Sequence, residues 1–550
     1  MSTSPNPVLD VRDLHISYSQ GDERPTVVHG VSFTVEPGEV VALVGESGSG
    51  KTSTAQAVIG LLAENGRVES GSILLNGEDI SRWSARRLRS IRGAVVSLVP
   101  QDPGSSLNPV LTIGAQVREI LQIHGRLDRR TADRKVIELL ANVGLSQPEL
   151  RIHQYPHELS GGMKQRVLIA IAIALRPALI IADEPTSALD VTVQRRILDL
   201  IDDLRREHGT SVLLVTHDLG VAADRSDRLI VLQGGRIQEQ GKTADVLASP
   251  QSAYTRKLLS DAPSLSVAKP RPPVEPGRPA ALTVTNLVQD FSLPTGKSFR
   301  AVDNISFSVA RGTTHAVVGE SGSGKTTTIR SIAGFQKPTS GEIRLGDLDV
   351  ASLRSEALRQ FRRKVQLVYQ NPWASLDPRQ TAQAIVEEPL LNFDPLPRAE
   401  REARVRAIIE RVGLPATVLS RLPHALSGGQ RQRVAIARAL VLEPEVVVLD
   451  EAVSALDVTV QAQILELLAE LQRDLGLTYV FVSHDLAVVR QIADTVSVLH
   501  NGRQVDYGTV DEVFSSTSTA YTRELIEAIP GQKFPRAEIS RQPIKTGLLS

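Results

Sequence analysis

Short apolar runs recur along the chain, and each ends at a glycine, an acidic residue or a polar turn. The runs are Val40–Val44, Ala178–Ala182, Val212–Val215, His315–Val318, Val446–Leu449 and Tyr479–Val482. Runs of this kind, without polar alternation, are typical of strands buried on both faces of a parallel sheet. Helical patterns lie between them. The pattern therefore predicts an α/β fold with a mostly parallel core sheet.

Two other patterns extend this core. Alternating apolar and polar positions in Val8–Tyr18 and Val31–Val35 predict an added antiparallel sheet. Helical spacing predicts a separate helical subdomain, on the faces Ile113, Val117, Ile120, Leu121 and Val136, Ile137, Leu140, Val143. The longest apolar run, Val167–Leu175, is far short of the ~20 residues that cross a bilayer. Because Arg-Pro follows it, we expect a buried helix there.

The whole arrangement occurs twice. The octapeptide GESGSGKT stands at Gly45–Thr52 and again at Gly319–Thr326, and each copy is followed in order by LSGG, Asp-Glu, SALDVTVQ and His-Asp-Leu. The two lysines are 274 residues apart, whereas the later motifs are each 267 apart, so seven residues were gained or lost before LSGG. The segment AYTR at Ala253–Arg256 also returns at Ala520–Arg523. A duplicated domain explains this pattern.

The repeat predicts two large domains, at residues 1–262 and 282–530. Residues 263–281 between them contain many prolines, and such a segment favours extended geometry and acts as a semi-rigid linker. We expect a poorly ordered tail at residues 531–550.

Composition narrows the functional classes. The 62 basic and 62 acidic residues balance, so no global field favours nucleic acid. The chain has no cysteine, which excludes disulfides, thiolate zinc sites and cysteine-ligated iron–sulfur clusters. The first residues lack a basic start and an apolar core, so we expect no secretory signal.

The octapeptides are P-loops. Their glycines let backbone N–H groups turn inward around phosphates, the lysine reaches the outer phosphates, and the threonine offers a hydroxyl to Mg²⁺. The alternative is a glycine-rich turn without a ligand. The candidate ATP-binding residues are Gly45, Ser47, Gly48, Ser49, Gly50, Lys51, Thr52, Ser53, Gly319, Ser321, Gly322, Ser323, Gly324, Lys325, Thr326 and Thr327.

Acidic pairs and histidines follow later apolar runs. Asp183 and Asp450 end such runs, where a carboxylate can hold Mg²⁺. The adjacent Glu184 and Glu451 can polarise the attacking water, because phosphoryl transfer depends mostly on positioning and charge neutralisation. A single such acid could equally be an N-terminal helix residue that interacts favourably with the helix dipole. The candidate histidines His217 and His484 could touch the γ-phosphate, although a lone histidine there is more often a core residue.

The LSGG segments offer a second anion cradle. Their residues Ser160, Gly161, Gly162, Ser427, Gly428 and Gly429 each precede a predicted long helix. A hydroxyl, bare N–H groups and a helix N-terminus can bind a phosphate, and the nucleotide they serve would be the other domain's. Ordinary helix capping is the alternative.

These motifs, in this order, resemble the nucleotide-binding domains of ATP-binding cassette (ABC) proteins over nearly the whole chain. The resemblance implies a head-to-tail sandwich with two ATP molecules between the halves. Gln101 and Gln370 would join the ATP and magnesium sites, with Asp190 and Asp457 between them, and Tyr18 and Phe291 match the position that stacks on adenine. One site would combine the first P-loop with Ser427 and Gly429, and the other the second P-loop with Ser160 and Gly162.

Both sites keep every catalytic residue type, which predicts two hydrolytic sites. The departures are mild. Met163 replaces the usual glutamine after SGG, and Glu451 is followed by AVSALD rather than PTSALD. Phe291 replaces tyrosine and loses only a hydroxyl.

The segments QDPGSSLNP and QNPWASLDP, at Gln101–Pro109 and Gln370–Pro378, look like the dipeptide/oligopeptide/nickel branch of importer ATPases. That likeness implies two membrane permeases, an extracytoplasmic solute-binding protein, and a peripheral place on the cytoplasmic face of the bacterial inner membrane. Many members of this branch carry a cysteine cluster near a domain end, and this chain has none. Peptide, nickel, glutathione and opine-like solutes all stay open, with peptide favoured by family frequency.

Rival classes remain. Twin-cassette proteins that act on ribosomes usually have a long charged helical linker, and those that act on DNA carry coiled coils or zinc-binding cysteines. Neither feature is present, and the neutral charge argues against a phosphate-backbone partner. Exporters commonly have permeases fused to the cassette, and this chain has none.

Overall fold

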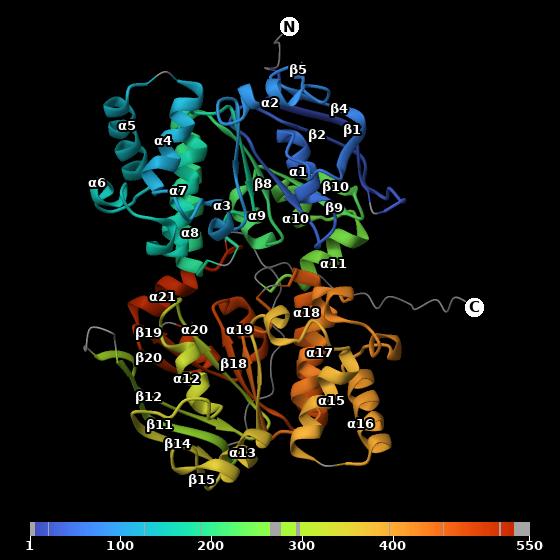
Figure 1. Cartoon of the computed structure of the whole chain (residues 1–550), viewed down its shortest axis with the longest axis vertical. Helices are drawn as coiled ribbons and strands as arrows, with labels where there is room; N and C mark the ends of the chain where they lie inside the picture. The colour runs from blue at the N-terminus through green and yellow to red at the C-terminus, as the bar shows by residue number, and fades with distance from the viewer. Residues whose placement is uncertain are drawn as a thin grey trace. The chain divides into compact units, whose positions relative to one another are not determined.

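A computed structural model describes residues 6–19, 21–125, 127–187, 189–263, 277–292, 298–394, 396–454, 456–515 and 519–532 (Figure 1). The chain divides into two compact units, residues 1–267 with 530–550, and residues 268–529. Most of the expected linker 263–281, and the expected tail from residue 533 onward, lie outside the described residues. The proposed domain boundaries at 262 and 282 remain predictions.

The first unit contains two sheets. Its strands are β1 (Leu9–Tyr18), β2 (Thr26–Val35), β3 (Val40–Val44), β4 (Gly66–Leu75), β5 (Glu78–Asp79), β6 (Val96–Val99), β7 (Leu179–Asp183), β8 (Ser211–Val215), β9 (Arg228–Gln233) and β10 (Arg236–Lys242). The smaller sheet has the order β2-β1-β4-β5 and is antiparallel. The larger has the order β10-β9-β3-β8-β7-β6, and only β10 runs antiparallel. The predicted mostly parallel core and added antiparallel sheet are confirmed.

Helices of the first unit pack around the large sheet and form a separate group beside it (Figure 1). They are α1 (Lys51–Ile59), α2 (Ala85–Ile91), α3 (Pro103–Ser106), α4 (Ile113–His124), α5 (Arg129–Asn142), α6 (Pro148–Arg151), α7 (Gly161–Ile173), α8 (Val191–His208), α9 (Leu219–Arg225), α10 (Thr243–Ala248) and α11 (Ala253–Asp261). The predicted helical subdomain, between the P-loop and LSGG, contains α4 to α6. On the predicted face of α4, Ile113, Val117 and Leu121 are fully buried and Ile120 is partly buried, so the helical spacing marked the packed side.

The second unit repeats this architecture. Its strands are β11 (Ala280–Ser292), β12 (Ser298–Ala310), β13 (Thr314–Val318), β14 (Ser340–Leu345), β15 (Leu348–Asp349), β16 (Val365–Val368), β17 (Val446–Asp450), β18 (Thr478–Ser483), β19 (Thr495–His500) and β20 (Arg503–Thr509). Its helices are α12 (Lys325–Ile332), α13 (Ser355–Lys364), α14 (Pro372–Ser375), α15 (Ala382–Phe393), α16 (Arg398–Arg411), α17 (Gly428–Leu440), α18 (Val458–Leu475), α19 (Leu486–Ile492), α20 (Val510–Phe514) and α21 (Ala520–Glu527). The sheets have the orders β12-β11-β14-β15 and β16-β17-β18-β13-β19-β20.

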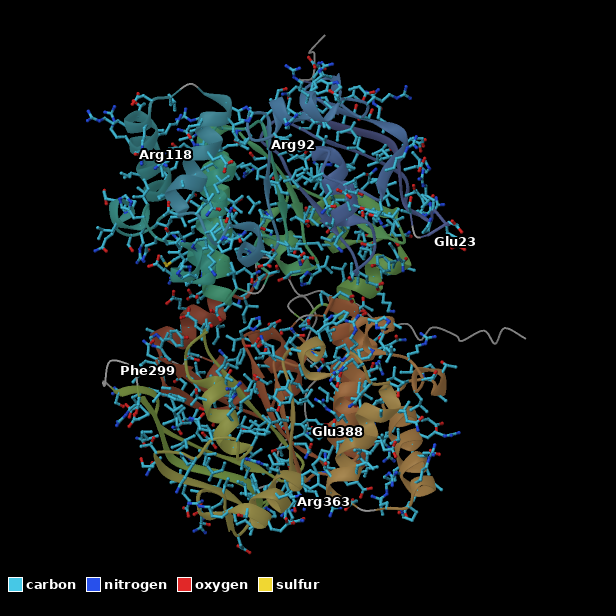
Figure 2. All side chains as sticks on the ribbon, in the orientation of Figure 1. Glu23, Arg92, Arg118, Phe299, Arg363 and Glu388 are labelled. Carbon is cyan, nitrogen blue, oxygen red and sulfur yellow. The ribbon has the colours of Figure 1, made fainter. Side chains whose placement is uncertain are left out.

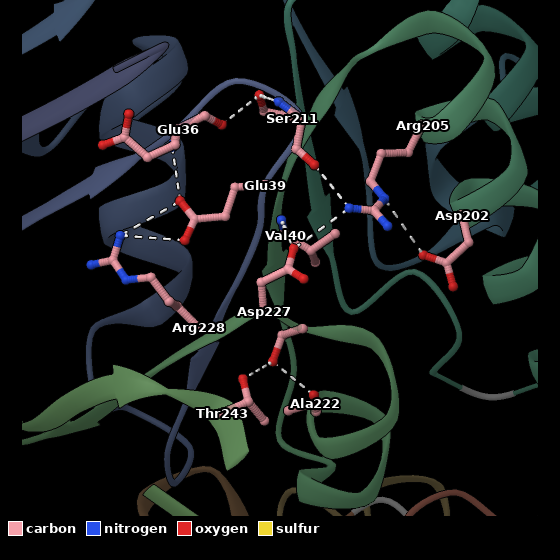
Figure 3. Close-up of polar contacts among 12 residues, drawn as sticks. Glu36, Glu39, Val40, Asp202, Arg205, Ser211, Ala222, Asp227, Arg228 and Thr243 are labelled. Carbon is pink, nitrogen blue, oxygen red and sulfur yellow. Dashed lines mark hydrogen bonds and ion pairs between the residues drawn. The ribbon is translucent and has the colours of Figure 1, made fainter. Parts of the chain in front are cut away.

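A polar network holds the amino-terminal end of β3, opposite the end that leads into the P-loop (Figure 3). The carboxylate of Asp227 accepts the N–H of Val40 at 2.8 Å, and Arg205 bonds to the same carboxylate at 3.5 Å. Glu39 accepts from Arg228 at 3.4 Å. These contacts join β3 to β9 and α8. The central strand is therefore fixed at one end before its other end turns into the glycine-rich loop.

Arginine side chains also donate hydrogen bonds to backbone carbonyls at the end of the helix that follows each P-loop. The guanidinium of Arg92, labelled in Figure 2, donates to the carbonyl of Ile59 at 3.0 Å. In the second unit, Arg362 donates to the carbonyl of Gly334 at 2.7 Å. Both accepting residues lie at or just past the end of the helix that follows the P-loop, where carbonyls lack intrahelical partners. The same helix is thus tied down in both units.

The predicted buried helix after LSGG is confirmed as α7. Val167 and Ala170 are fully buried and lie within it. Among the residues that the structure describes, no helix combines the length and apolarity needed to cross a membrane.

Candidate functional site

Each P-loop joins the carboxyl end of the central strand to a helix. Gly50 and Gly324 are the N-cap residues of α1 and α12, in the left-handed conformation with φ of 96° and 100°. Because glycine has no side chain, no side-chain oxygen caps either helix. The first-turn N–H groups and the positive end of the helix dipole therefore favour an anion from outside the loop. Exposure follows one pattern in both loops, with the lysine and the serine two residues before it buried.

The P-loop lysines are held inside their loops. The Nζ atom of Lys51 donates to the carbonyls of Gly45 and Glu46, both at 2.8 Å. Lys325 repeats this with Gly319 at 2.7 Å and Glu320 at 2.8 Å. Both lysines are buried. The ammonium groups thus lie at the centre of the loop, where the chemistry of P-loops requires them.

The first glycine of each loop is required by close approach. A Cβ atom on Gly45 would lie 2.1 Å from the carbonyl oxygen of Leu232, and one on Gly319 would lie 2.2 Å from that of Leu499. Both glycines also have positive φ, 150° and 147°. Any other residue would therefore push the loop away from β9 or β19.

The structure brings the predicted glutamine, glutamate and histidine together in each unit. In the first, Gln101 donates to Glu184 at 2.7 Å, and Nδ1 of His217 lies 3.0 Å from the same carboxylate. In the second, Gln370 donates to Glu451 at 2.7 Å, and Nδ1 of His484 lies 3.2 Å away. The order of neighbouring strands explains the meeting, because β6, β7 and β8 are adjacent and all three residues follow their carboxyl ends.

Both glutamates have an unusual backbone. Glu184 and Glu451 have φ of 45°, in the left-handed region that non-glycine residues rarely adopt. Each is held there by its N–H, which donates to Val215 at 2.8 Å and to Val482 at 3.0 Å respectively. Such strain costs of order 1–3 kcal/mol and gathers at functional sites. In this backbone conformation, the glutamate side chain contacts the glutamine and the histidine.

The neighbouring aspartates lie in a different electrostatic setting. Burial, and then the charge of Glu184, raise the pKa of Asp183 to about 6. Burial and Glu451 raise the pKa of Asp450 to about 6 as well. In the first unit, the hydroxyl of Thr52 donates to Asp183 at 3.3 Å. In the first unit, a buried carboxylate next to a partly buried one, beside a threonine hydroxyl, forms a site that would gain from a positive charge.

The glutamates shift the other way. Burial by itself raises the pKa of Glu184, but the hydrogen bond and charge of His217 outweigh burial and hold that pKa below its ordinary value. In the second unit, the hydrogen bond and charge of His484 likewise outweigh burial and hold the pKa of Glu451 below its ordinary value. Burial alone lowers the pKa of His217, and its bond to Glu184 reverses this and raises it. The pair therefore favours an ionised carboxylate, the form that can polarise water.

The LSGG serines begin helices. Ser160 accepts the N–H of Met163 at 3.4 Å, and Ser427 accepts that of Gln430 at 3.2 Å, so both cap their own helices. The last glycine of each segment is also needed within its unit. A Cβ atom on Gly162 or Gly429 would lie 2.6 Å from a valine of the next long helix. By contrast, the same atom on Gly161 or Gly428 would meet ordinary contacts of 3.6 Å and 3.7 Å.

The remaining predicted residues lie at the edges of the site. Asp190 and Asp457 are the N-caps of α8 and α18. Tyr18 ends β1, and its hydroxyl donates to Ser53 at 3.1 Å, one residue past the P-loop threonine. Phe291 is near the end of β11 and is 40% exposed. The adenine role of both aromatics stays a prediction.

The sequence motifs did not predict one pair of contacts, in which a tyrosine bonds to each P-loop. The hydroxyls of Tyr254 and Tyr521 bond to the backbone of the two P-loops. The repeated AYTR segment was the available signal, but a repeat alone does not say which part of the fold it touches.

Comparison with known proteins agrees with this geometry. The family model described as "ABC transporter" matches residues 28–187 and 302–454, together more than half of the chain. A second model, "Oligopeptide/dipeptide transporter, C-terminal region", matches residues 238–300.

Relatives match along nearly the full length. The glutathione import ATP-binding protein GsiA of Shigella dysenteriae is 41% identical, over 99% of this chain and 92% of its own. The peptidoglycan transport ATP-binding protein YejF of Agrobacterium fabrum is 43% identical, over 96% and 97%. A solved dimer of the ATP-binding cassette MJ0796, bound to ADP and Pi, is 30% identical over 42% of this chain and 98% of that chain, with a TM-score of 0.39. The chain therefore belongs to the ABC transporter family, as an ATP-binding, two-cassette, ABC-type ATPase coupled to import.

Proposed function

We propose that this chain powers the import of short peptides or peptide-like solutes through two integral membrane permeases. The observation that carries the proposal is the glutamine, glutamate and histidine cluster, which is complete beside both P-loops. Two complete clusters support ATP hydrolysis in both cassettes. Phosphoryl transfer needs little beyond such positioning and charge.

The solute class is argued from the second family model and the relatives. The matched model is one of oligopeptide and dipeptide transporters. Two relatives of nearly equal identity carry different solutes in their names, glutathione and peptidoglycan. Glutathione is a tripeptide and peptidoglycan fragments contain short peptides, so a peptide backbone is the chemistry they share. We propose that class for this chain, and nickel and opine-like solutes become outcomes of the test.

Within each cassette the residues take separate roles. Lys51 and the N-terminus of α1 bind the phosphates. Glu184 orients the attacking water and accepts its proton, while Gln101 and His217 hold that carboxylate in place. The second cassette uses Lys325, Gln370, Glu451 and His484 in the same way. The contacts on the carboxylate and general phosphoryl-transfer chemistry support these proposed assignments.

The residues fit a magnesium ion. Thr52 and Asp183 would hold it, with Thr326 and Asp450 in the second cassette and Gln101 and Gln370 nearby. Mg²⁺ usually takes one or two carboxylates plus phosphate oxygens, and the contact of Thr52 with Asp183 places one carboxylate beside one hydroxyl. When bound, Mg²⁺ neutralises charge on the outer phosphates. The raised pKa values of the two aspartates support this fit, because a cation would favour their ionised forms.

We further propose that ATP binding closes the two cassettes head to tail. Ser427 and Gly429 would then complete the first site, and Ser160 and Gly162 the second. Closure driven by contacts that exist only in the closed state is a population shift, which hydrolysis reverses. The permeases would follow this closure, and an extracytoplasmic binding protein would deliver the solute. The chain would lie on the cytoplasmic face of the bacterial inner membrane.

Affinity capture of the tagged chain from detergent-solubilised native membranes tests the partners. We expect two multi-spanning proteins and one binding protein by mass spectrometry. The double variant Lys51→Ala/Lys325→Ala should capture the same proteins but hydrolyse no ATP. Ribosomal proteins or nucleic acid, with nothing from the membrane, would show that a twin-cassette protein of the ribosome or DNA class is the better description. Proteoliposomes of the captured complex then identify the solute by uptake of labelled dipeptides, glutathione or nickel.

A further inference from the structure

Both AYTR segments contact a P-loop. The hydroxyl of Tyr254 accepts a hydrogen bond from the N–H of Glu46 at 3.2 Å, and that of Tyr521 accepts from the N–H of Glu320 at 3.2 Å. Glu46 and Glu320 are the second residues of the two GESGSGKT loops. The partners are 208 and 201 residues apart in sequence. The same contact thus forms independently in both units.

The tyrosine of the first unit lies on α11, and hydrogen bonds to Glu239 fix the start of this helix. We call these hydrogen bonds the clamp. The tyrosine is the second residue of α11, whose N-cap is Ser252. The carboxylate of Glu239, in β10, accepts the N–H groups of Gln251 at 2.8 Å and of Ser252 at 3.0 Å. The start of the helix is therefore fixed to the last strand of the large sheet.

The second unit uses a different acid for the same clamp. Asp506, in β20, accepts the N–H of Thr519 at 3.0 Å and its hydroxyl at 2.7 Å. Thr519 is the N-cap of α21, and Tyr521 is the second residue of that helix. The ring of Tyr521 also stacks on His500, with 3.9 Å between centroids and 17° between planes. Aspartate in place of glutamate leaves the contact with the P-loop at the same length.

The hairpin beside each clamp also holds the loop. The N–H of Gly235, between β9 and β10, donates to the carbonyl of Ser49 at 3.1 Å. Gly502 donates to Ser323 at 3.1 Å in the second unit. The final hairpin and the tyrosine helix, α11 or α21, therefore hold each P-loop at two points.

The loop residue that donates to the tyrosine also binds the P-loop lysine. Glu46 donates its N–H to Tyr254 and accepts from the Nζ atom of Lys51 through its carbonyl at 2.8 Å. Glu320 is held in the same way between Tyr521 and Lys325. A glycine-rich loop has much conformational freedom to lose when it binds a ligand. A bond that already orders the loop reduces this loss.

We propose that Tyr254 and Tyr521 are positioning residues for ATP binding. Each hydroxyl fixes the P-loop in the conformation that presents its lysine to the phosphates, and the helix that carries the tyrosine, α11 or α21, sets the nucleotide affinity of its own cassette. Tyr254 lies in the region matched by the oligopeptide/dipeptide model, which gives that region a role at the ATP site. The inference rests on the proposed function only in taking the P-loops as the phosphate sites, and it is independent of solute and permease.

The test replaces tyrosine by phenylalanine in the full chain. The double variant Tyr254→Phe/Tyr521→Phe keeps both rings, including the ring stacked on His500, and removes only the hydroxyls. We expect the KM for ATP, and the dissociation constant of a fluorescent ATP analogue, to rise about 3- to 10-fold, from the loss of one hydrogen bond per site. kcat should change by less than about twofold. The matched control is Tyr507→Phe, half exposed on β20, which should leave both constants unchanged.

Two more variants separate the outcomes. Glu239→Gln removes one acceptor oxygen from the clamp of the first unit, and it should raise the KM less than additively when combined with Tyr254→Phe. The reference Lys51→Ala/Lys325→Ala should abolish nucleotide binding. If the reference still binds ATP normally, the assignment of the phosphate sites fails. If the reference fails to bind but the tyrosine variants keep the parent KM, or lose kcat alone, the positioning role is overturned.

Discussion

The side-chain amide of Gln101 donates to the carboxylate of Glu184 at 2.7 Å, and Gln370 donates to Glu451 at the same distance. Each glutamine lies in the loop after the edge strand of its sheet, and each glutamate follows the neighbouring strand. This hydrogen bond therefore links the position of the glutamine loop to that of the carboxylate. A partner that displaces the glutamine loop would act on the carboxylate without touching the nucleotide.

The glutamates should carry hydrolysis and not binding. In Glu184→Gln/Glu451→Gln the amide can no longer accept a proton from water, so we expect ATP hydrolysis to fall by about 100-fold or more. Affinity for a fluorescent ATP analogue should stay within about threefold. Phosphate release and fluorescence titration measure the two quantities. The control Glu207→Gln makes the same substitution at an exposed site on α8, and a normal rate in the double variant would refute the assignment.

Crossed serine variants should reveal the pairing of the cassettes. In a Glu184→Gln background only the second site hydrolyses ATP, and our proposal completes that site with Ser160. Adding Ser160→Ala should lower the remaining rate at least about tenfold, whereas adding Ser427→Ala should not. If both serines only cap their helices, each alanine would cost about 1 kcal/mol of stability and the two rates would match. Single-turnover hydrolysis distinguishes these results.

The sequence predicted the strands that carry the site more accurately than the strands beside it. Val40–Val44 was predicted with the bounds of β3, because a strand covered on both faces has one continuous apolar run. The expected strand Val31–Val35 begins at Thr26 in the structure, as β2. Bulges shift its register against β1 and break the alternation on which the prediction depended. The two-residue strands β5 and β15 carry no pattern at all.

The candidate site shows a similar limit. Motifs gave the residue types, but the contact between Gln101 and Glu184 joins positions 83 residues apart and depends on the adjacency of β6 and β7. The strained backbone of Glu184 has no signature in its sequence. The tyrosine contact needed the fold as well, since AYTR as a string names no partner.

The first glycine of the P-loop should tolerate no side chain. In Gly45→Ala the new Cβ atom would meet the carbonyl oxygen of Leu232, so the loop must shift. We expect ATP affinity to fall more than tenfold and the free energy of unfolding to fall by about 1–3 kcal/mol. The control Gly209→Ala also places alanine at positive φ, but in open space at the end of α8. It should lower the free energy of unfolding by about 1–2 kcal/mol, the cost of the left-handed conformation for a residue with a Cβ atom, and leave ATP affinity unchanged; an equal loss of affinity in both would contradict the close-approach argument.

The second unit should lose stability in acid through His315. This side chain is fully buried in β13 between the hydroxyls of Thr495 at 2.8 Å and Ser497 at 2.9 Å, and burial lowers its pKa to about 3. The unfolded imidazole takes up a proton below about pH 6.5, and the folded one does not until about pH 3. The free energy of unfolding should therefore fall by about 1.4 kcal/mol per pH unit as pH drops through this window.

His315→Val removes the titrating group, and valine is the residue at the matching position, Val41, of the first cassette. The chain has two tryptophans, Trp83 and Trp373, so a Trp83→Phe background makes fluorescence report on the second unit alone. Urea unfolding at pH 7 and pH 5 should give a smaller difference with valine than with histidine. Equal differences would place the acid sensitivity elsewhere.

Each P-loop, its lysine, its glutamine–glutamate–histidine cluster and the hairpin and helix that hold it come from one continuous stretch of chain, on one side or the other of residues 263–281. A gene divided in that segment would yield two polypeptides that each keep these contacts. What the single polypeptide adds is stoichiometry. Every first cassette is synthesised with one second cassette, so the closure that we propose would take place at the effective concentration set by the segment between them, regardless of how dilute the protein is in the cell.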